Sequence, residues 1–302
     1  MITILIKNNH YIIPITYNKN RKLLFLGENV QITNPNQLME LHDNEFIGEL
    51  PKLTNSQINF NGKNNVLVCE EGVHLWNSRI DFNMDNSVLY LSTNSHDYSV
   101  NIALHKSNVC FIGKNNFFNG QTVFVLSEAK NIIMGDDCFI SYNVVFRTSD
   151  GHCIYDDESK RRINYAGSIY VGDHVWFGQN AMIFKGSKIG SGSILGANSV
   201  VSNKSINSNV TCAGAPVKLI HKNTFWTPHS VNGWGEEEID KMSESKSNLF
   251  SYEVGDDTLD LETVENELNN FSDTEEVVTY IWYKFLVGGK NRFAIKNEEE
   301  LS

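Results

Sequence analysis

One histidine stands where residue type and spacing favour proton transfer. His152 follows Thr148-Ser-Asp-Gly151 and opens a polar stretch that interrupts a regular repeat before Val171. A polar loop extruded from a regular repeat is usually functional, and a residue at its root is held by the adjoining rigid coil. Because an imidazole exchanges a proton near neutral pH, His152 is a candidate general base. The alternative is a histidine that only satisfies hydrogen bonds within the loop.

Two acids and one tryptophan are candidate companions of this histidine. Asp150 and Asp173 are candidates to orient the imidazole, and either could instead be an ordinary turn residue. Trp176 follows a position that points inward in the repeat, so it should project outward from the first coil after the loop. A packing role at a subunit interface is its alternative explanation.

The elements that must position these residues repeat every six residues. Large side chains recur at this spacing at Met134, Ile140, Phe146, and then at Val171, Phe177, Ile183, Ile189, Leu195 and Val201. The second run is six uninterrupted hexads, and glycine follows the large residue in four of them. The position four residues after each large one is mostly small.

A period of six fits neither a helix, which repeats near 3.6 residues, nor a flat strand, which repeats at two. It fits a short strand and a tight turn, three times per coil, in a stacked solenoid. Large side chains fill the corners of the interior, and glycine supplies the turns. The sequence therefore predicts a mainly β fold, a left-handed parallel β-helix with an extruded loop.

The register continues upstream and sets the bounds of the first two segments. Another three-hexad coil, at Ile112, Phe118 and Phe124, is displaced by four residues before Met134, and residues 66–104 read as degenerate coils. We expect residues 1–60 to form an N-terminal β cap, with short strands at 11–15 and 23–26, and residues 61–220 to form the β-helix catalytic domain. Pro216 should end the repeat.

Residues 221–302 should form an acidic, largely helical C-terminal tail. Two helices are expected, at 257–271 and 272–287, and the second has an apolar face that should be buried against the body or a neighbouring subunit. The tail also holds most of the net charge of −11, because residues 236–276 contain 15 acids and only two lysines. Residues 1–235 contain 19 basic and 18 acidic residues, so the body is near neutral and free to bind anions.

Composition excludes several classes of protein. No dense basic face with interleaved aromatics is present, which disfavours a nucleic-acid binder. No apolar stretch is long enough for a membrane span, and no signal peptide is evident, so we expect a cytoplasmic protein. The five cysteines contain no C-x-x-C pair, which fits a reduced compartment and predicts no metal site.

The loop and the hexads carry a family resemblance. The relevant segments are Ser149-Asp-Gly-His152, Ile154-Tyr-Asp156, Arg161-Arg-Ile-Asn164, Val171-Gly-Asp-His-Val-Trp-Phe-Gly178 and Gly214-Ala-Pro-Val-Lys-Leu-Ile220. They resemble hexapeptide-repeat acetyltransferases, and among them the bacterial O-acetyltransferases of capsular polysaccharides, including the polysialic acid O-acetyltransferases. The resemblance covers roughly residues 110–222.

The resemblance implies acetyl-CoA as donor, a homotrimer with active sites between adjacent subunits, and His152 as general base. It also implies that Trp176 shapes the donor and acceptor site. By the same resemblance the cofactor contacts are Gly178, Ala181, Gly196, Ala197 and Lys218. The basic run Lys160-Arg161-Arg162 would either bind a carboxylated acceptor, such as a sialic acid polymer, or pair with the preceding acids Asp156-Asp-Glu158.

The resulting hypothesis is an acetyl-CoA-dependent O-acetyltransferase that acts on a bacterial surface polysaccharide such as a sialic acid-containing capsule. The alternatives are transfer to a small acceptor such as a hexose, a nucleotide sugar or serine, and a trimeric scaffold without enzymatic activity. A zinc carbonic anhydrase shares the fold but needs three histidines with closer spacing than His152 and His174 have.

Overall fold

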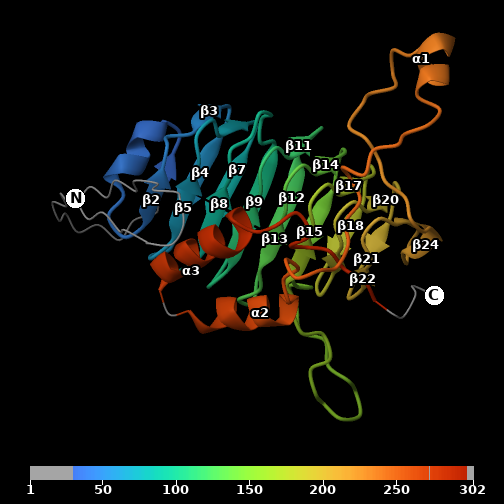
Figure 1. Ribbon diagram of the computed structural model, residues 1–302. Helices are drawn as coiled ribbons and strands as arrows, with labels where there is room; N and C mark the ends of the chain where they lie inside the picture. Colours follow the sequence, from blue (N-terminus) through green and yellow to red (C-terminus); the bar gives the residue numbers. More distant parts are fainter. Residues whose placement is uncertain (1–29, 272, 298–302) are drawn as a thin grey trace.

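The chain forms an elongated three-sided prism of short strands (Figure 1). The structure, a computed structural model, describes residues 30–271 and 273–297. Each coil contributes one strand to each side, and strands of successive coils pair in parallel. The predicted fold class, a left-handed parallel β-helix with an extruded loop and a helical tail, is confirmed.

Three sheets make the sides of the prism. The first contains β1 (Val30–Ile32), β4 (Gln57–Phe60), β7 (Arg79–Phe82), β9 (Val100–Leu104), β12 (Thr122–Leu126), β15 (Val145–Arg147), β18 (Met182–Phe184) and β21 (Val200–Val201). The second contains β2 (Glu45–Gly48), β5 (Val66–Cys69), β8 (Val88–Leu91), β10 (Val109–Ile112), β13 (Ile132–Met134), β16 (Ile169–Val171), β19 (Lys188–Ile189) and β22 (Ser205–Ile206). The third contains β11 (Phe117–Phe118), β14 (Phe139–Ile140), β17 (Trp176–Phe177), β20 (Ile194–Leu195), β23 (Thr211–Ala213) and β24 (Lys218–His221).

The third side begins with a separate two-stranded sheet. This sheet pairs β3 (Lys52–Thr54) with β6 (His74–Trp76) in parallel. Leu75 bridges to Tyr98, whose ring packs on Phe118 of β11 at 5.5 Å between centroids. All three side chains are buried inside the prism, so the neighbouring residues on the same strands point outward.

The coils are of two lengths. Ile112 pairs with Met134, 22 residues on, whereas Val171 pairs with Ile189 after only 18. The hexad period therefore holds from Val171 to Val201, the last coil is one residue shorter, and each coil before the loop carries extra turn residues. The four-residue displacement before Met134 is this surplus. Longer turns cost little because each projects into solvent without breaking the ladders.

The N-terminal end differs from the expected boundary at residue 61. β2 already pairs in parallel with β5, and β4 with β7, so the first coil starts inside the segment that we expected to be a separate cap. The capping part is shorter: β1 pairs antiparallel with β4, and the 3₁₀ helix η1 (Pro35–Glu40) buries Leu38 at the open end. Strands expected at 11–15 and 23–26 lie outside the described residues.

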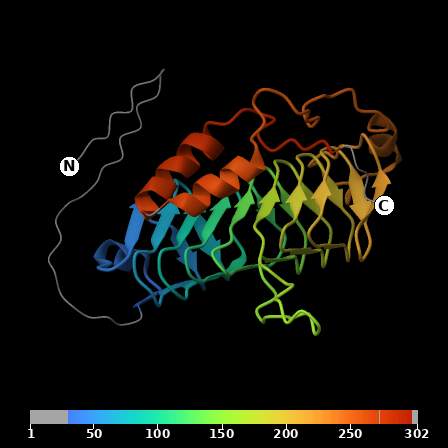
Figure 2. The same cartoon turned by 90° about the horizontal axis from the view of Figure 1, so that it is seen from below.

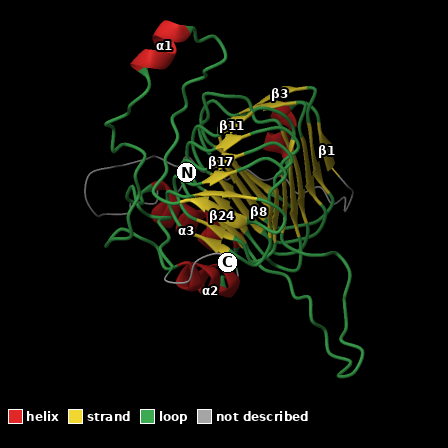
Figure 3. Cartoon of the chain, turned by 90° about the vertical axis from the view of Figure 1, so that its right-hand side faces the viewer, coloured by secondary structure: helices red, strands yellow, loops and turns green. Residues whose placement is uncertain are grey.

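The tail covers the second sheet. Helices α2 (Leu261–Asn270) and α3 (Thr274–Ile281), with the π-helical turn η2 (Trp282–Leu286), lie along it (Figure 2). Val277, Ile281 and Phe285 pack on outward side chains such as Tyr90 and Phe111. The apolar face of the second helix is thus buried against the body, as one of the two expected possibilities. A shorter helix, α1 (Glu236–Lys241), has no buried residue and projects away from the prism (Figure 3).

Candidate functional site

The loop that contains His152 leaves the prism where the first sheet gives way to the second. β15 of the first sheet ends at Arg147, and β16 of the second begins at Ile169. The intervening residues form an exposed hairpin, closed by an antiparallel bridge between Tyr155 and Arg162. In Figure 1 this hairpin hangs below the coils on the side opposite α1.

His152 lies at the root of this hairpin with an exposed side chain. Its backbone carbonyl accepts a hydrogen bond of 2.7 Å from Asn164 Nδ2, and Asn164 Oδ1 accepts one of 2.7 Å from the Ile154 N–H. Among the described residues of the single chain, no hydrogen bond or ion pair engages the imidazole. The loop therefore fixes the backbone of His152 through a buried asparagine and leaves its ring available.

Asp150 anchors the loop and is not positioned by a contact with His152. Its carboxylate pairs with Lys185 Nζ and accepts a hydrogen bond of 2.8 Å from Asn164 Nδ2. The hydrogen bond from Lys185, followed by that from Asn164, lowers the pKa of Asp150. In the single chain the predicted role of orienting the imidazole has no contact to support it, and the observed contact ties the loop root to Lys185, directly after β18.

The predicted basic run divides between two environments. Arg162 pairs with Glu128 at 2.8 Å, and Ser149 Oγ donates a hydrogen bond to the same carboxylate, which lowers the pKa of Glu128. Lys160 pairs with Asp157 at 2.6 Å on the exposed hairpin. Arg161 is exposed beside them. Two members of the run thus have acidic partners within the chain, one of them outside the expected Asp156–Glu158 segment.

Trp176 lies on the third sheet, in β17, and projects outward as expected. Its side chain is 40% exposed. Phe139, on the neighbouring strand, meets it edge-on at 6.2 Å between centroids, and Trp226 from the tail lies at 5.8 Å. Trp226 was missed from the sequence because it lies beyond the last hexad, where no register predicts its position.

The position of Trp226 is set by a stack of three rings. His174 lies between Trp226, at 3.9 Å and 2° between planes, and Phe250, at 4.0 Å and 9°. Trp226 Nε1 donates a hydrogen bond of 2.9 Å to the His174 carbonyl. Burial lowers the pKa of His174, which favours a neutral ring in the stack. The tail thereby places a second indole beside Trp176.

The predicted cofactor residues extend along the third side from Trp176 toward the C-terminal end. Gly178 and Gly196 follow β17 and β20, Ala197 is exposed, and Lys218 is exposed on β24. A Cβ on Gly178 would stand 2.5 Å from the Ala197 backbone nitrogen, so this close approach requires glycine. Ala181 is the exception, because it has no exposed surface and fills the interior of a coil. Its side chain therefore does not face a ligand, contrary to the expectation.

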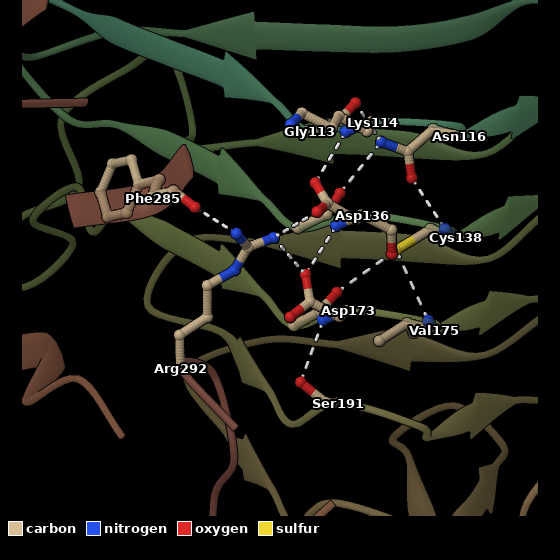
Figure 4. A network of polar contacts seen from close by, with 12 residues as sticks. Gly113, Lys114, Asn116, Asp136, Cys138, Asp173, Val175, Ser191, Phe285 and Arg292 are labelled. Carbon is tan, nitrogen blue, oxygen red and sulfur yellow. Dashed lines mark hydrogen bonds and ion pairs between the residues drawn. The ribbon is translucent and has the colours of Figure 1, made fainter. Parts of the chain in front are cut away.

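A buried ion network holds the tail near this surface (Figure 4). Arg292, whose side chain is 5% exposed, pairs with Asp136 at 2.8 Å and Asp173 at 2.7 Å and donates to the Phe285 carbonyl. Burial raises the pKa of Asp173 to about 6, and the charge of Arg292 opposes that rise. Asp173 is therefore held in a buried ion pair at another corner of the prism, and within the single chain it has no contact with His152.

One chain does not bring the two halves of the candidate site together. The His152 loop leaves the edge between the first and second sheets, whereas Trp176, Gly178 and Lys218 lie on the third. In a three-sided prism that edge is opposite the third side. A site that uses both halves therefore requires two chains.

Residues 30–271 and 273–297 offer neither a cluster of metal ligands nor a membrane-spanning helix. These residues contain no group of three or more His, Cys, Asp and Glu side chains placed to hold a metal ion. No helix among them is long and apolar enough to cross a membrane.

Comparison with known proteins places the chain. It is 47% identical over 102 residues to a polysialic acid O-acetyltransferase of Escherichia coli O1:K1, and 46% identical over 113 residues to one of Neisseria meningitidis. These matches span 33% and 52% of the relatives, and 34% and 37% of this chain. No family profile matches.

Solved structures give the wider match. The polySia-specific acetyltransferase NeuO superimposes with a TM-score of 0.55 and 30% identity, over 67% of this chain and 94% of NeuO. The polysialic acid O-acetyltransferase OatWY has a TM-score of 0.50 and 23% identity, over 67% of this chain and 99% of its own, and supports the fold alone. The chain belongs to the hexapeptide-repeat acetyltransferases, as the resemblance in its sequence predicted.

Proposed function

We propose that this protein is an acetyl-CoA-dependent O-acetyltransferase that modifies a hydroxyl of a bacterial surface polysaccharide containing sialic acid. The observation that carries the proposal is the state of His152, an exposed imidazole that has no partner among the described residues, on a backbone that Asn164 fixes by a hydrogen bond. The names of the matched relatives support the acceptor class. We also place the protein in the cytoplasm, which is consistent with the proposed acetyl-CoA donor.

The chemistry requires one proton transfer to the enzyme. A sugar hydroxyl is a poor nucleophile until its proton is accepted, and His152 is the base that accepts it. The hydroxyl oxygen then forms a bond to the thioester carbonyl carbon, and the carbon–sulfur bond breaks to release the thiol of CoA. The proton held by His152 passes to the departing sulfur. Such a base contributes about 10² to 10⁴-fold.

The donor and acceptor are assigned to different surfaces. The donor is assigned to the third side, where Ala197 and Lys218 are exposed and Lys218 offers a cation to the phosphates. Trp176 forms the wall where donor and acceptor meet. On the same hairpin as His152, Arg161 is exposed, and we assign it to attract a carboxylated acceptor. Its neighbours Lys160 and Arg162 are already paired with carboxylates of the hairpin and of Glu128.

The active form is a homotrimer. Since the His152 loop and the Trp176 surface lie on opposite parts of one prism, each site combines the loop of one subunit with the third side of the next. A closed ring of three identical, head-to-tail contacts gives three equivalent sites.

The first test is acceptor-dependent release of thiol from acetyl-CoA. The acceptors are polysialic acid, other capsular polysaccharides, free hexoses and serine. We expect turnover with a sialic acid-containing polymer, and a fall of about 10² to 10⁴-fold in kcat for His152→Ala. Cys153→Ser, a change at the next exposed loop residue, is the matched control and should keep wild-type turnover.

Three outcomes would contradict the proposal. Turnover only with hexoses, a nucleotide sugar or serine would show that the acceptor is a small molecule. Equal turnover in His152→Ala would show that His152 is not the general base. No binding of acetyl-CoA at all would favour the alternative of a trimeric scaffold.

A further inference from the structure

A groove on the outside of the prism lies apart from the candidate site. It is formed by the wide N-terminal coils on the third side and has a volume of about 630 Å³. Its lining residues are Trp76, Asn77, Ser95, His96, Asp97, Ser99, Phe117, Phe118, Asn119, Gly120 and Gln121. Nothing in the proposed transfer step uses these residues.

Trp76 presents an aromatic surface to this groove. Its side chain is 44% exposed, although large indole rings are usually covered. His74 meets the indole edge-on at 6.1 Å between centroids. The His74 ring is itself fixed from two sides, by Thr54 Oγ1 at 2.8 Å and Asp97 at 2.7 Å. The exposed indole of Trp76 therefore packs against an imidazole whose own position is fixed by two polar contacts.

Most of the remaining lining residues are polar, and none of them is a lysine or arginine. Their amide and hydroxyl side chains can both donate and accept hydrogen bonds, which suits a ligand rich in hydroxyl groups. The one carboxylate, Asp97, is paired with His74 and would repel an anionic ligand. With only three apolar side chains among eleven, the lining does not resemble the apolar core of a subunit interface.

The groove and Trp176 lie on the same side of the prism. Phe117 of the groove pairs in register with Phe139, which pairs in register with Trp176. A contact at 4.9 Å between the rings of His96 and Phe117 extends this outward row toward the N-terminus. Trp76 lies four strands from Trp176, a distance of about 19 Å at the usual spacing of paired strands. One extended polymer could therefore contact both.

We propose that this groove is a second acceptor subsite, which binds uncharged sugar units of the glycan several units from the hydroxyl that is acetylated. The indole of Trp76 stacks on a sugar ring, and the amide and hydroxyl side chains bind its hydroxyl groups. The inference rests on the proposed function, because it assigns the groove to the same acceptor chain.

A binding experiment tests the subsite without turnover. His152→Ala protein is titrated with a neutral hexose hexasaccharide and with a sialic acid hexamer, and contacts are followed by saturation-transfer NMR. We expect the neutral oligosaccharide to bind, and Trp76→Ala in the same background to weaken that binding about tenfold, equivalent to about 1.4 kcal/mol. Trp76→Phe should retain most of the affinity. Met84→Ala, which removes an exposed side chain outside the groove, is the matched control and should change nothing.

Kinetics provide the second test. With wild-type His152, Trp76→Ala should raise KM about tenfold for a long polymer that contains neutral sugars and leave both its kcat and the KM of a short acceptor unchanged. Unchanged KM values, or an equal change for short and long acceptors, would overturn the subsite. So would a Trp76-dependent affinity for the sialic acid hexamer alone. A change of oligomeric state in Trp76→Ala would instead assign the groove to a subunit contact. If no acceptor turns over but the neutral oligosaccharide still binds at Trp76, the proposed reaction fails and the subsite stands.

Discussion

The coils before the His152 loop and those after it solve the same packing problem differently. Before the loop each coil takes 21 or 22 residues, and aromatic rings stack inside it, as Phe60 on Phe82 at 4.6 Å between centroids. After the loop each takes 17 or 18, and small buried residues such as Ser193 and Ser199 occupy the interior beside Leu195. The same pattern of parallel strand pairing therefore accommodates coils of two lengths, because the extra residues of the longer coils lie in the turns.

The loop occupies the junction between the wide and the compact coils. In our proposal the compact coils hold the donor, the wide coils hold the distant part of the acceptor, and His152 lies between them. The tail spans the same junction, because Arg292 pairs with Asp136 before the loop and with Asp173 after it. The following predictions disturb this division, from the largest effect to the smallest.

Removal of the cation at the junction should have the largest effect on stability. Arg292→Met leaves Asp173 buried without its partner, and loss of one member of a buried pair costs about 3–5 kcal/mol. The melting temperature should therefore fall, and amide hydrogen exchange should become faster in α2 and α3. Addition of Asp173→Asn should restore part of the loss. A single mutant as stable as wild type would show that the wide and compact coils stay joined without this ion network.

A substitution on the compact coils should change the KM for the donor and leave the KM for the acceptor unchanged. Lys218→Gln removes an exposed cation from the proposed phosphate contact, so KM for acetyl-CoA should rise about three- to fivefold, as expected for an exposed charge pair of up to about 1 kcal/mol. KM for the polysaccharide should stay constant, which is the reverse of the result expected for Trp76→Ala. Lys222→Gln, directly after β24, removes the same charge outside the proposed phosphate contact and serves as the comparison. An equal rise in both KM values for Lys218→Gln would erase the division between donor and acceptor coils.

The smallest expected effect is the contribution of His174 to the pH dependence of stability. Because burial lowers the pKa of His174, the neutral ring contributes stability above its ordinary value of about 6.5, and that contribution is lost as pH falls through the lower folded value. Burial raises the pKa of Asp173 to about 6, so protonation of Asp173 increases the stability of the folded protein as the pH falls. This effect opposes that of His174. The informative quantity is therefore the difference between wild type and His174→Asn in how far the melting temperature falls with pH.

Asparagine is a suitable replacement for His174 because it tolerates the left-handed backbone there, at φ 55°. Melting temperatures at pH 7.5 and pH 5.5, read through tryptophan fluorescence, should show a larger fall in wild type than in His174→Asn. Identical falls would mean that protonation of the ring does not disturb its stack with Trp226 and Phe250.

The sequence predicts regular features and misses local ones. The hexads located the compact coils, and the apolar runs at residues 66–104 indicated the wide coils without their length, since turn residues leave no hydrophobic period. Trp176 was placed outward correctly because its neighbour Phe177 is in register. Trp226 and Arg292 were missed because their positions depend on how an aperiodic tail folds back over the coils. The expected role of Asp150 as an orienting acid finds no contact, since spacing along the chain does not reveal Lys185 as its partner.

The central claim is that each active site combines the loop of one subunit with the third side of another. It is tested most directly by mixing two inactive variants, His152→Ala and Trp176→Glu, the second of which places a carboxylate on the donor surface. Trimers that carry both variants are isolated through two different tags. Every such trimer contains one site with both halves intact, so activity should return to roughly one third of the wild-type value in a closed ring of three. Mixed trimers as inactive as their parents would contradict the claim and place the whole site within one chain.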